Sequence, residues 1–352
     1  MKYGNRLGVI AQLVLTFVDG TSETIASDSK WRFGGSPIIS SSIYDGEVYD
    51  MTKSQQAWST PDFDDSTWED VETKTHDPKL LRSPDASPIR EVESLPAVGI
   101  LKSPSGKTIL DFGQNLVGYI RFKIPAGSKG QKIRLIHTEV LENGECATRP
   151  LRIAKATDEL TLSDTEQGTY WNPRFTFHGF RYVEVTNWPG TLDAADFTAV
   201  VVHTEMRRLG TFECSNDLLN KLHQNVVWSM KGNFVGIPTD CPQRDERLGW
   251  TGDLQAFAST AAFLYDCHGM LKSWLRGLAA EQKATESSVP PLVSPNVIPM
   301  PPKPIAIWGD CVILAPWDLY QSFGDKSVLE NQFESMEDWL EKGIPRIESG
   351  LW

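Results

Sequence analysis

The stretch Pro238-Thr-Asp-Cys-Pro-Gln-Arg-Asp-Glu-Arg-Leu-Gly-Trp-Thr-Gly-Asp253 is the most informative part of the chain, because the pattern around it decides the fold. Pro242, Gly249 and Gly252 interrupt the stretch, so it cannot form one regular helix with a solvated charged face. Four carboxylates, two guanidinium groups and one indole are therefore gathered in an irregular loop. The elements on either side determine what holds this loop in place.

The segments after Phe212 predict a helical region, because their apolar residues recur about every 3.6 positions. Ser215 or Asn216 can cap the first helix. Its apolar residues are Leu218, Leu219, Leu222 and Val226. Further helices are expected at about 254–265, 270–278 and 310–323, the last with a kink at Pro316. The loop therefore connects two helices.

A fifth helix is expected to begin at the capping box formed by Ser327 and Glu330. The residues that we expect this helix to bury are Leu329, Phe333, Met336 and Trp339. The loop lengths favour antiparallel helix pairs, and five helices are too few to close a large helical barrel.

The first two thirds of the chain predict short strands separated by turn residues. The strand-like segments lie at 7–17, 120–124, 132–137, 159–162, 175–177, 182–185 and 198–203. Regular short strands of this kind are typical of antiparallel β-sandwiches. A Pro/Ser/Asp-rich stretch from His76 to Pro96 has little periodicity and is expected to be a linker between two β modules.

These patterns predict a multidomain β + α protein. We expect part of an N-terminal β-sandwich domain plus linker in residues 1–95, and a second, fuller β-sandwich domain in residues 96–212. The helical hairpins occupy residues 213–352.

Composition limits the classes of partner. The net charge of −12, with no cluster of Lys and Arg, argues against a nucleic acid and favours a neutral or small substrate. No apolar run is long enough to cross a membrane, and no signal peptide or N-glycosylation sequon is visible, so the sequence as written predicts a cytoplasmic protein. The five cysteines are widely spaced and odd in number, which favours reduced thiols: Cys146, Cys214, Cys241, Cys267 and Cys311.

The loop carries the groups that glycoside hydrolysis needs. One carboxylic acid protonates the leaving oxygen, and a second carboxylate activates water or attacks the anomeric carbon. The acid must keep its proton near neutral pH, which requires burial or a neighbouring negative charge. Glu246 has candidates for that neighbour in Asp245, Asp240 and Asp253.

Two further side chains of the loop suit sugar binding. Arg244 offers a rigid fork of hydrogen-bond donors, and Trp250 offers an apolar platform for the C–H face of a sugar. Two other interpretations stay open on the charge pattern alone. The charges can form surface salt bridges of little energetic value, or the carboxylates can bind calcium or magnesium. The metal site is disfavoured by Arg244 and Arg247, which would repel a cation.

The residues 237–253 closely resemble the catalytic signature of the α-L-rhamnosidases of glycoside hydrolase family 78. Other segments are similar to further signatures of this family. They are Tyr44-Asp-Gly-Glu-Val-Tyr-Asp50, Asp111-Phe-Gly-Gln-Asn-Leu-Val-Gly118, Phe177-His-Gly-Phe-Arg-Tyr182 and Trp308-Gly-Asp310. The resemblance extends over essentially the whole chain.

The resemblance implies an (α/α)6 six-hairpin barrel preceded by β-sandwich domains, the second of them concanavalin-like. It also implies hydrolysis of terminal α-L-rhamnose, with inversion, from rhamnose-containing glycosides or oligosaccharides. Carried onto matching positions, Glu246 would be the general acid and Asp245 and Arg247 would be supporting residues. The rhamnose would be held by Asp240, Arg244, Trp250 and Asp253, with Trp308 in the apolar wall. No cofactor is required, and a calcium ion on a β domain stays an open alternative.

The chain departs from the family pattern at both ends. It begins inside the family's N-terminal β domain, at Tyr3-Gly4, and it ends at Gly350-Leu-Trp352, before the region of the general-base glutamate. We therefore expect a chain truncated at both ends, with little or no hydrolytic activity of its own. A non-catalytic carbohydrate-binding or scaffold fragment is the alternative. His178 and His203, which lie on strand-like segments, are expected to be structural and not substitutes for the base.

Overall fold

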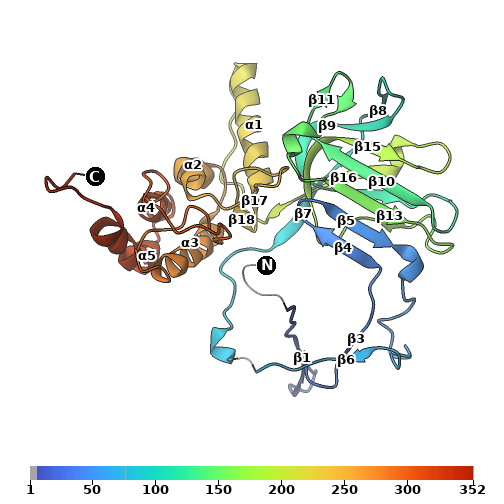
Figure 1. Cartoon of the computed structure of the whole chain (residues 1–352), viewed down its shortest axis with the longest axis horizontal. Helices are drawn as coiled ribbons and strands as arrows, with labels where there is room; N and C mark the ends of the chain where they lie inside the picture. The colour runs from blue at the N-terminus through green and yellow to red at the C-terminus, as the bar shows by residue number, and fades with distance from the viewer. Residues whose placement is uncertain (1–5, 76, 352) are drawn as a thin grey trace.

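The computed structural model describes residues 6–75 and 77–351. A sheet-rich part comes first along the chain and a helical part follows it, and helix α1 lies between the two (Figure 1). The strands of the sheet-rich part extend to residue 204, and the first helix starts at residue 217. The predicted order of β elements followed by helices is confirmed. Tyr3, Gly4, His76 and Trp352, which entered the sequence analysis, lie outside the described residues.

The N-terminal segment forms two small ladders. Strand β1 (Gln12–Thr16) pairs with β2 (Ser22–Ala26) across the turn at Asp19 and Gly20, where Gly20 has a φ of 84°. Strand β3 (Arg32–Phe33) pairs with β6 (Glu69–Asp70). The strand expected at 7–17 is therefore shorter at its start.

A ten-stranded sheet forms the main β body. Eight strands follow one another in the order β4 (Ile38–Ser42), β5 (Gly46–Asp50), β13 (Thr157–Thr161), β10 (Lys132–Thr138), β15 (His178–Thr186), β9 (Thr108–Lys123), β16 (Phe197–Thr204) and β7 (Ile89–Pro96). Strands β8 (Gly99–Lys102) and β14 (Tyr170–Trp171) also pair with β9. Among the described residues, the strand pairs of this sheet are antiparallel except β5 with β13, which is parallel. Two-residue strands β11 (Leu141–Glu142) and β12 (Glu145–Cys146) pair beside the sheet.

The length of β9 explains how this sheet encloses a core. The first half of β9 pairs with β8 and β15, and its second half pairs with β16 and β14. Gly118 lies where the partners change, and a Cβ there would be 1.8 Å from the carbonyl oxygen of Val200. Glycine is therefore required for this close approach. Inward side chains of β9, β10, β15 and β16 form one buried apolar cluster.

Two sequence predictions about strands are wrong. The expected strand at 175–177 is a turn, because the buried carboxylate of Glu47 accepts hydrogen bonds from the backbone N–H groups of Arg174 and Phe175, and β15 starts only at His178. The end of the expected linker is strand β7, which pairs with β16 over seven residue pairs. The domain boundary near residue 95 stays a prediction. Strands β4, β5 and β7 start before residue 95 and nevertheless belong to the main sheet, so the sheet itself does not mark a boundary there.

Five α-helices form the second part: α1 (Asp217–Asn233), α2 (Thr251–Leu264), α3 (His268–Lys283), α4 (Cys311–Phe323) and α5 (Lys326–Asp338). The hairpin of β17 (Phe234–Val235) and β18 (Ile237–Pro238) follows α1. Asn216 caps α1 through its side-chain oxygen, as predicted, and Pro316 lies inside α4. Residues of all five helices share one apolar core, which contains the fully buried Trp339. Helix α1 also contacts β9 and β16, so it joins the helices to the sheet.

The predicted start of α5 is wrong, and its predicted buried face is confirmed for Trp339, which lies directly after the helix, but not for Phe333. The side chain of Asp325, and not Ser327, caps the helix by accepting a hydrogen bond from the Ser327 N–H group. The helix buries Val328, Gln332 and Ser335, while Phe333 is 64% exposed. Ser335 hydrogen-bonds with Gln282 of α3, so a polar contact between helices, and not the apolar stripe, sets the face that turns inward.

Three leucines of α1 are also exposed, since Leu218 is 80% exposed and Leu219 and Leu222 are about half exposed. The five cysteines are free thiols. Among the described residues, no helix combines the length and apolar character that a membrane span requires. The cytoplasmic location stays a prediction.

Candidate active site

The loop from residue 239 to 250 connects strand β18 to helix α2 and closes on itself. The backbone N–H of Asp240 donates to the carbonyl of Leu248 (3.2 Å), and the N–H of Leu248 donates to the Asp240 carboxylate (3.0 Å). At the centre of the loop the Arg247 N–H donates to the thiol sulfur of Cys241 (3.2 Å). These bonds hold the loop in a fixed shape without regular secondary structure.

Three of the predicted site residues form one charged cluster on this loop. Nε of Arg244 lies 2.9 Å from Oε2 of Glu246, and Nη2 of the same guanidinium lies 3.2 Å from Oδ2 of Asp240. The side chain of Asp240 is almost completely buried, and those of Arg244 and Glu246 are partly buried. The arginine fork therefore joins the two carboxylates and fixes their orientation. The charges do form salt bridges, but the near-complete burial of the Asp240 side chain argues against the alternative of solvent-exposed pairs of little energetic value.

Two residues of the sheet-rich part also contact Glu246, and the sequence analysis missed both. Nη1 of Arg152 forms an ion pair with Oε2 of Glu246 at 2.9 Å, and the hydroxyl of Tyr44 donates to the Glu246 carbonyl at 3.0 Å. Tyr44 begins the segment 44–50, which is similar to a signature of the family, although the tyrosine itself was not predicted as a site residue. Arg152 has no local motif that could have revealed it, because it lies 94 positions before Glu246 in the sequence.

Arg247 anchors the loop to the sheet-rich part. Its guanidinium donates to the carbonyls of Ile43 (2.6 Å) and Phe177 (3.1 Å) and lies over the rings of Tyr44 and Phe177. The residue is 4% exposed, and this burial lowers the pKa of Arg247 to about 10. The predicted supporting role of Arg247 therefore has a clear structural form. Asp245 makes a weaker contact, accepting a hydrogen bond from the Ile153 N–H at 3.4 Å.

The end of the loop is held by the backbone of residues 292–294. Gly249 and Ser294 form a backbone hydrogen bond of 2.9 Å, and a Cβ at Gly249 would lie 2.1 Å from the Ser294 carbonyl oxygen. That carbonyl also accepts a hydrogen bond from the indole of Trp274 (2.8 Å). The N–H and hydroxyl of Thr251 both donate to the carbonyl of Leu292. Helix α2 therefore starts at a fixed place, directly after Trp250.

Two predicted tryptophans lie beside the start of α2. Trp250 precedes the helix, and the indole of Trp308 packs against Gly252, where a Cβ would lie 2.7 Å from its ring. In the described part of the chain the indole N–H groups of Trp250 and Trp308 are buried and have no hydrogen-bond partner. Such donors suit a polar ligand.

Asp253 lies in the first turn of α2. Partial burial of its carboxyl group, with a contribution from the negative charges of Asp240 and Glu246, raises the pKa of Asp253. Because these charges act on one another, Asp253 belongs to the same electrostatic cluster as Asp240 and Glu246. All six predicted site residues therefore lie on the loop, on the first turn of α2, or packed against that turn. Their individual roles stay predictions.

The close packing of Trp308 on Gly252 gives a testable prediction. Gly252→Ala should displace the Trp308 indole and lower the free energy of unfolding by about 1–3 kcal/mol, the usual cost of overpacking a close contact. The matched control is Gly277→Ala in α3, where the new Cβ meets only ordinary van der Waals contact at 3.8 Å. Urea unfolding followed by tryptophan fluorescence measures both. Equal stability of the two variants would contradict this packing.

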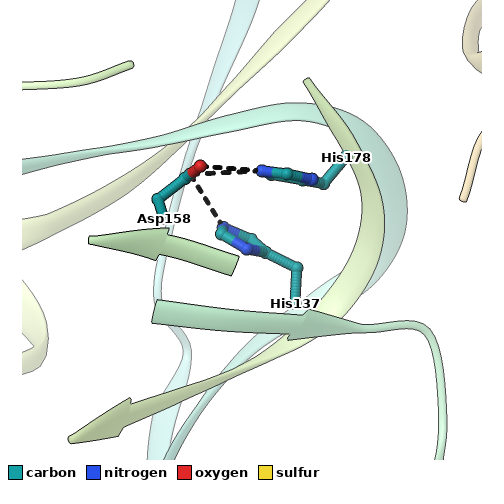
Figure 2. A group of neighbouring side chains, drawn as sticks. All are labelled: His137, Asp158 and His178. Atoms are coloured by element: carbon teal, nitrogen blue, oxygen red, sulfur yellow. Dashed lines mark hydrogen bonds and ion pairs between the residues drawn. The ribbon is translucent and has the colours of Figure 1, made fainter. Parts of the chain in front are cut away.

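A second titratable cluster lies inside the sheet and is fully buried (Figure 2). Nε2 of His178 donates to both carboxylate oxygens of Asp158 at 3.1 and 3.2 Å, while Nδ1 of His137 donates to the carbonyl of Ala156 at 2.9 Å. Asp158 also accepts from the Glu47 N–H, so the cluster joins β5, β10, β13 and β15. The predicted structural role of His178 agrees with this position. His203 is likewise buried, with Nδ1 donating to Thr204.

The donor set of this cluster, two histidines and one aspartate, resembles a metal site, but the ring geometry does not suit one. The imidazole rings of His137 and His178 are stacked, with centroids 4.2 Å apart and planes 23° from parallel. Nearly parallel rings direct their in-plane lone pairs along separate lines, so the two nitrogens do not converge on one ion at about 2.0–2.1 Å. We infer a structural role for the cluster.

The cluster predicts a loss of stability in acid. Burial, followed by the charge of His178, lowers the pKa of His137 from 6.5 to about 3, so the unfolded chain binds a proton at a higher pH than the folded one does. Unfolding is therefore favoured increasingly as the pH falls from about 6.5 towards 3. The free energy of unfolding should drop by roughly 2–3 kcal/mol between pH 7 and pH 4.5 from this residue.

Urea unfolding of the wild type and of His137→Gln at several pH values tests this prediction. The variant should show a flatter pH dependence, whereas His223→Gln, a control in α1 whose ring accepts a hydrogen bond from Arg208, should follow the wild type. Parallel pH curves for the wild type and His137→Gln would refute it.

Loop, helices and sheet together define a class of protein. Carboxylates joined by an arginine, with two tryptophans carrying free indole donors, lie at the start of a helical hairpin and are braced by a β domain. This is the arrangement of a glycoside hydrolase.

Three family models match the chain in succession. Residues 1–93 match the α-L-rhamnosidase N-terminal domain, and residues 101–203 match the bacterial α-L-rhamnosidase concanavalin-like domain. Residues 207–352 match the bacterial α-L-rhamnosidase six-hairpin glycosidase domain. The chain belongs to the α-L-rhamnosidase family. The predicted fold class and family are confirmed.

Solved structures of α-L-rhamnosidases are similar over most of the chain. The enzyme from Aspergillus terreus is 52% identical with a TM-score of 0.94, over 97% of this chain and 40% of that one. The Streptomyces avermitilis enzyme complexed with L-rhamnose is 42% identical with a TM-score of 0.88, over 94% of this chain and 32% of that one. A curated α-L-rhamnosidase from an Alteromonas species is 38% identical over 94% of this chain. The chain spans about a third of the length of the curated relatives it matches.

Proposed function

We propose that this chain carries the general acid and the main rhamnose-binding groups of an inverting α-L-rhamnosidase. The observation that carries the proposal is the Arg244 guanidinium, which joins Asp240 to Glu246 beside two tryptophans with unpartnered indole N–H groups. The relative from Streptomyces avermitilis, whose structure was solved with L-rhamnose, supports rhamnose as the sugar.

In the proposed reaction Glu246 gives its proton to the glycosidic oxygen while the bond between that oxygen and the anomeric carbon breaks. A water molecule adds to the opposite face of the anomeric carbon and loses its own proton to a base, so the products are the free alcohol and β-L-rhamnose. Asp240, Arg244 and Asp253 bind sugar hydroxyls, and Trp250 and Trp308 bind the apolar face. The reaction uses no cofactor.

The spacing of the carboxylates supports a binding role for Asp240. Its nearest carboxylate oxygen and that of Glu246 lie within 4.8 Å of each other. An acid and a base that invert configuration stand about 6.5–9.5 Å apart, to leave room for the water. Asp240 is therefore too close to Glu246 to be the base, and its bonds to Arg244 and Leu248 suit a residue that orients the sugar.

A sugar panel tests the proposed substrate. L-Rhamnose, L-fucose and D-mannose are each titrated into the 352-residue chain and followed by tryptophan fluorescence, because Trp250 and Trp308 lie at the site. L-Rhamnose should bind at least tenfold more tightly than the other two sugars, since a site built to hydrogen-bond particular hydroxyls discriminates by about this much or more. Equal affinity for the three sugars, or no saturable response to any of them, would rule out the proposal.

The alternative from another class, a carbohydrate-binding fragment without catalysis, is separated by Glu246→Gln. A binding protein should keep both its affinity and its lack of turnover in this variant. An enzyme should keep its affinity and lose its turnover.

A further inference from the structure

A bulge in strand β9 lies outside the proposed rhamnose site. It belongs to the segment 111–118, which resembles a signature of the family. The pairing of β9 with β15 shifts there, so that residues 112–115 of β9 lie opposite the single residue Arg181. The Asp111 carboxylate accepts hydrogen bonds from the N–H of Gly113 (2.7 Å) and from the guanidinium of Arg181 (2.8 and 3.0 Å). These contacts fix the bulge, and a bulge of this kind redirects side chains out of the ladder.

A cavity of about 250 Å³ lies between this bulge and helix α1. Gln114 and Asn115 line it on the sheet side, and Asn225, Ser229 and Asn233 line it on the helix side. Residues four apart lie on one face of a helix, and a helix that packs on a sheet normally presents apolar residues there. The face of α1 that lies towards the bulge is polar instead, so it suits a ligand better than direct packing on the sheet.

Close contacts fix the walls of the cavity. Gly232 of α1 lies next to Val117 of β9, where a Cβ would be only 2.7 Å from the valine side chain. Pro242, from the loop that carries Glu246, forms part of the same wall. The helix, the bulge and the loop therefore meet at the cavity in a fixed arrangement.

Polar groups with unused hydrogen-bonding capacity surround the cavity. In the described part of the chain, the side chains of Asn225 and Ser229 form no hydrogen bond with another residue. Oε1 of Gln243, the next residue of the loop, is buried and has no partner. Its Nε2 donates to Glu139, whose other carboxylate oxygen accepts from Asn115. A polar ligand would use the groups that are left.

These groups define the chemistry of the ligand. Glu139 is the one charged residue among the described residues that line the cavity, and both its oxygens are engaged, so it braces Asn115 and Gln243 and does not suit an ion. Carboxamide and hydroxyl groups both donate and accept, as the neighbouring hydroxyls of a sugar do. Trp228 adds an apolar wall, and its ring is held by Nζ of Lys231 at 4.2 Å. The volume lies below the roughly 300–1,000 Å³ of pockets for drug-sized ligands, which suits one sugar ring.

We propose that this cavity is a second carbohydrate site, which binds one neutral, fully hydroxylated hexose unit. Such a hexose is favoured over a deoxy sugar such as rhamnose, because polar groups on the two walls would be left unpaired beside a missing hydroxyl. The cavity shares no binding group with the rhamnose site, so the inference goes beyond the proposed function and does not depend on it. The hexose is either the neighbour of rhamnose in one substrate or a unit of a separate chain.

NMR titration with methyl β-D-glucoside and methyl β-D-galactoside tests the site. At least one of these hexosides should shift the side-chain amide signals of Asn115 and Asn225 in the wild type until the site is saturated. Asn225→Ala identifies the Asn225 signals and should weaken binding by about threefold to tenfold, the effect of losing a neutral hydrogen bond. Ser229→Leu fills the cavity and should abolish binding.

Gln224→Leu is the matched control, because Gln224 is also exposed on α1 but does not line the cavity. This variant should bind the hexoside as the wild type does. No saturable shift with either hexoside, or equal binding by the wild type, Asn225→Ala and Ser229→Leu, would overturn the proposal.

A disaccharide of L-rhamnose linked to the hexose that binds distinguishes the two sources of the sugar. If the hexose is the neighbour of rhamnose, the disaccharide should bind at least tenfold more tightly than L-rhamnose, and Ser229→Leu should lose this advantage. If the hexose belongs to a separate chain, the disaccharide should bind no more tightly than L-rhamnose, and saturating L-rhamnose should leave hexoside binding unchanged. A chain that binds the hexoside but no L-rhamnose would refute the proposed function and leave the second site standing.

Discussion

The slow hydrolysis of methyl α-L-rhamnoside that we expect of this chain should fall further in Glu246→Gln, by up to about 10²- to 10⁴-fold, the usual contribution of a positioned general acid. The loss on p-nitrophenyl α-L-rhamnoside should be much smaller, because this leaving group departs as the stable p-nitrophenolate anion and does not need to be protonated. The glutamine keeps a hydrogen-bonding carbonyl towards Arg244 and Arg152, so L-rhamnose should still bind within a few-fold of the wild type. Rates are measured with concentrated protein and the two substrates in parallel.

Glu139→Gln is the matched control for this variant. The Glu139 carboxylate accepts hydrogen bonds from Asn115 and from Gln243 of the same loop, so the change removes a nearby charge outside the proposed chemistry. It should change both rates by less than about threefold. Equal losses on the two substrates with Glu246→Gln would mean that Glu246 does not protonate the leaving group.

Arg247→Met should destabilise the folded chain by about 2–5 kcal/mol. The substitution leaves the carbonyls of Ile43 and Phe177, which accept part-buried hydrogen bonds, without their donor, and each unpaired group of this kind costs up to about 1–3 kcal/mol. It also removes the contact of the guanidinium with the rings of Tyr44 and Phe177. Because this arginine fastens the loop to the sheet-rich part, L-rhamnose binding should be lost together with stability.

Thermal and urea unfolding measure the effect of Arg247→Met. The control is Arg207→Met, which breaks an exposed ion pair with Asp266 and should cost less than about 1 kcal/mol. Similar stability of the two variants would show that the loop is not anchored through Arg247.

Much of the fold could be predicted from local sequence because local interactions determine it. Asn216 caps α1 through bonds to the next residues of the same helix, and the alternating Ile133, Leu135 and His137 of β10 are buried as their period of two predicts. The cluster of Asp240, Arg244 and Glu246 follows from seven consecutive positions broken by one proline.

The remainder depends on contacts between distant segments, which periodicity does not reveal. Helix α5 turns Ser335 inward because Gln282 of α3 offers it polar partners, although Phe333 is the more apolar residue. The turn at 175 exists because a glutamate more than 120 positions earlier accepts its N–H groups. Arg152 reaches Glu246 in the same way, across a long separation in sequence.

Isothermal titration with L-rhamnose of the wild type, Asp253→Asn and Asp217→Asn tests the central claim most directly. Both aspartates lie in the first turn of a helix, but only Asp253 is in the charged cluster of the proposed site. The wild type and Asp217→Asn should bind one L-rhamnose with equal affinity, and Asp253→Asn should bind it at least tenfold more weakly, because a hydrogen bond to a charged group contributes about 1.5–3 kcal/mol. Equal binding by all three proteins, or no binding by the wild type, would contradict the claim that this loop and helix hold rhamnose.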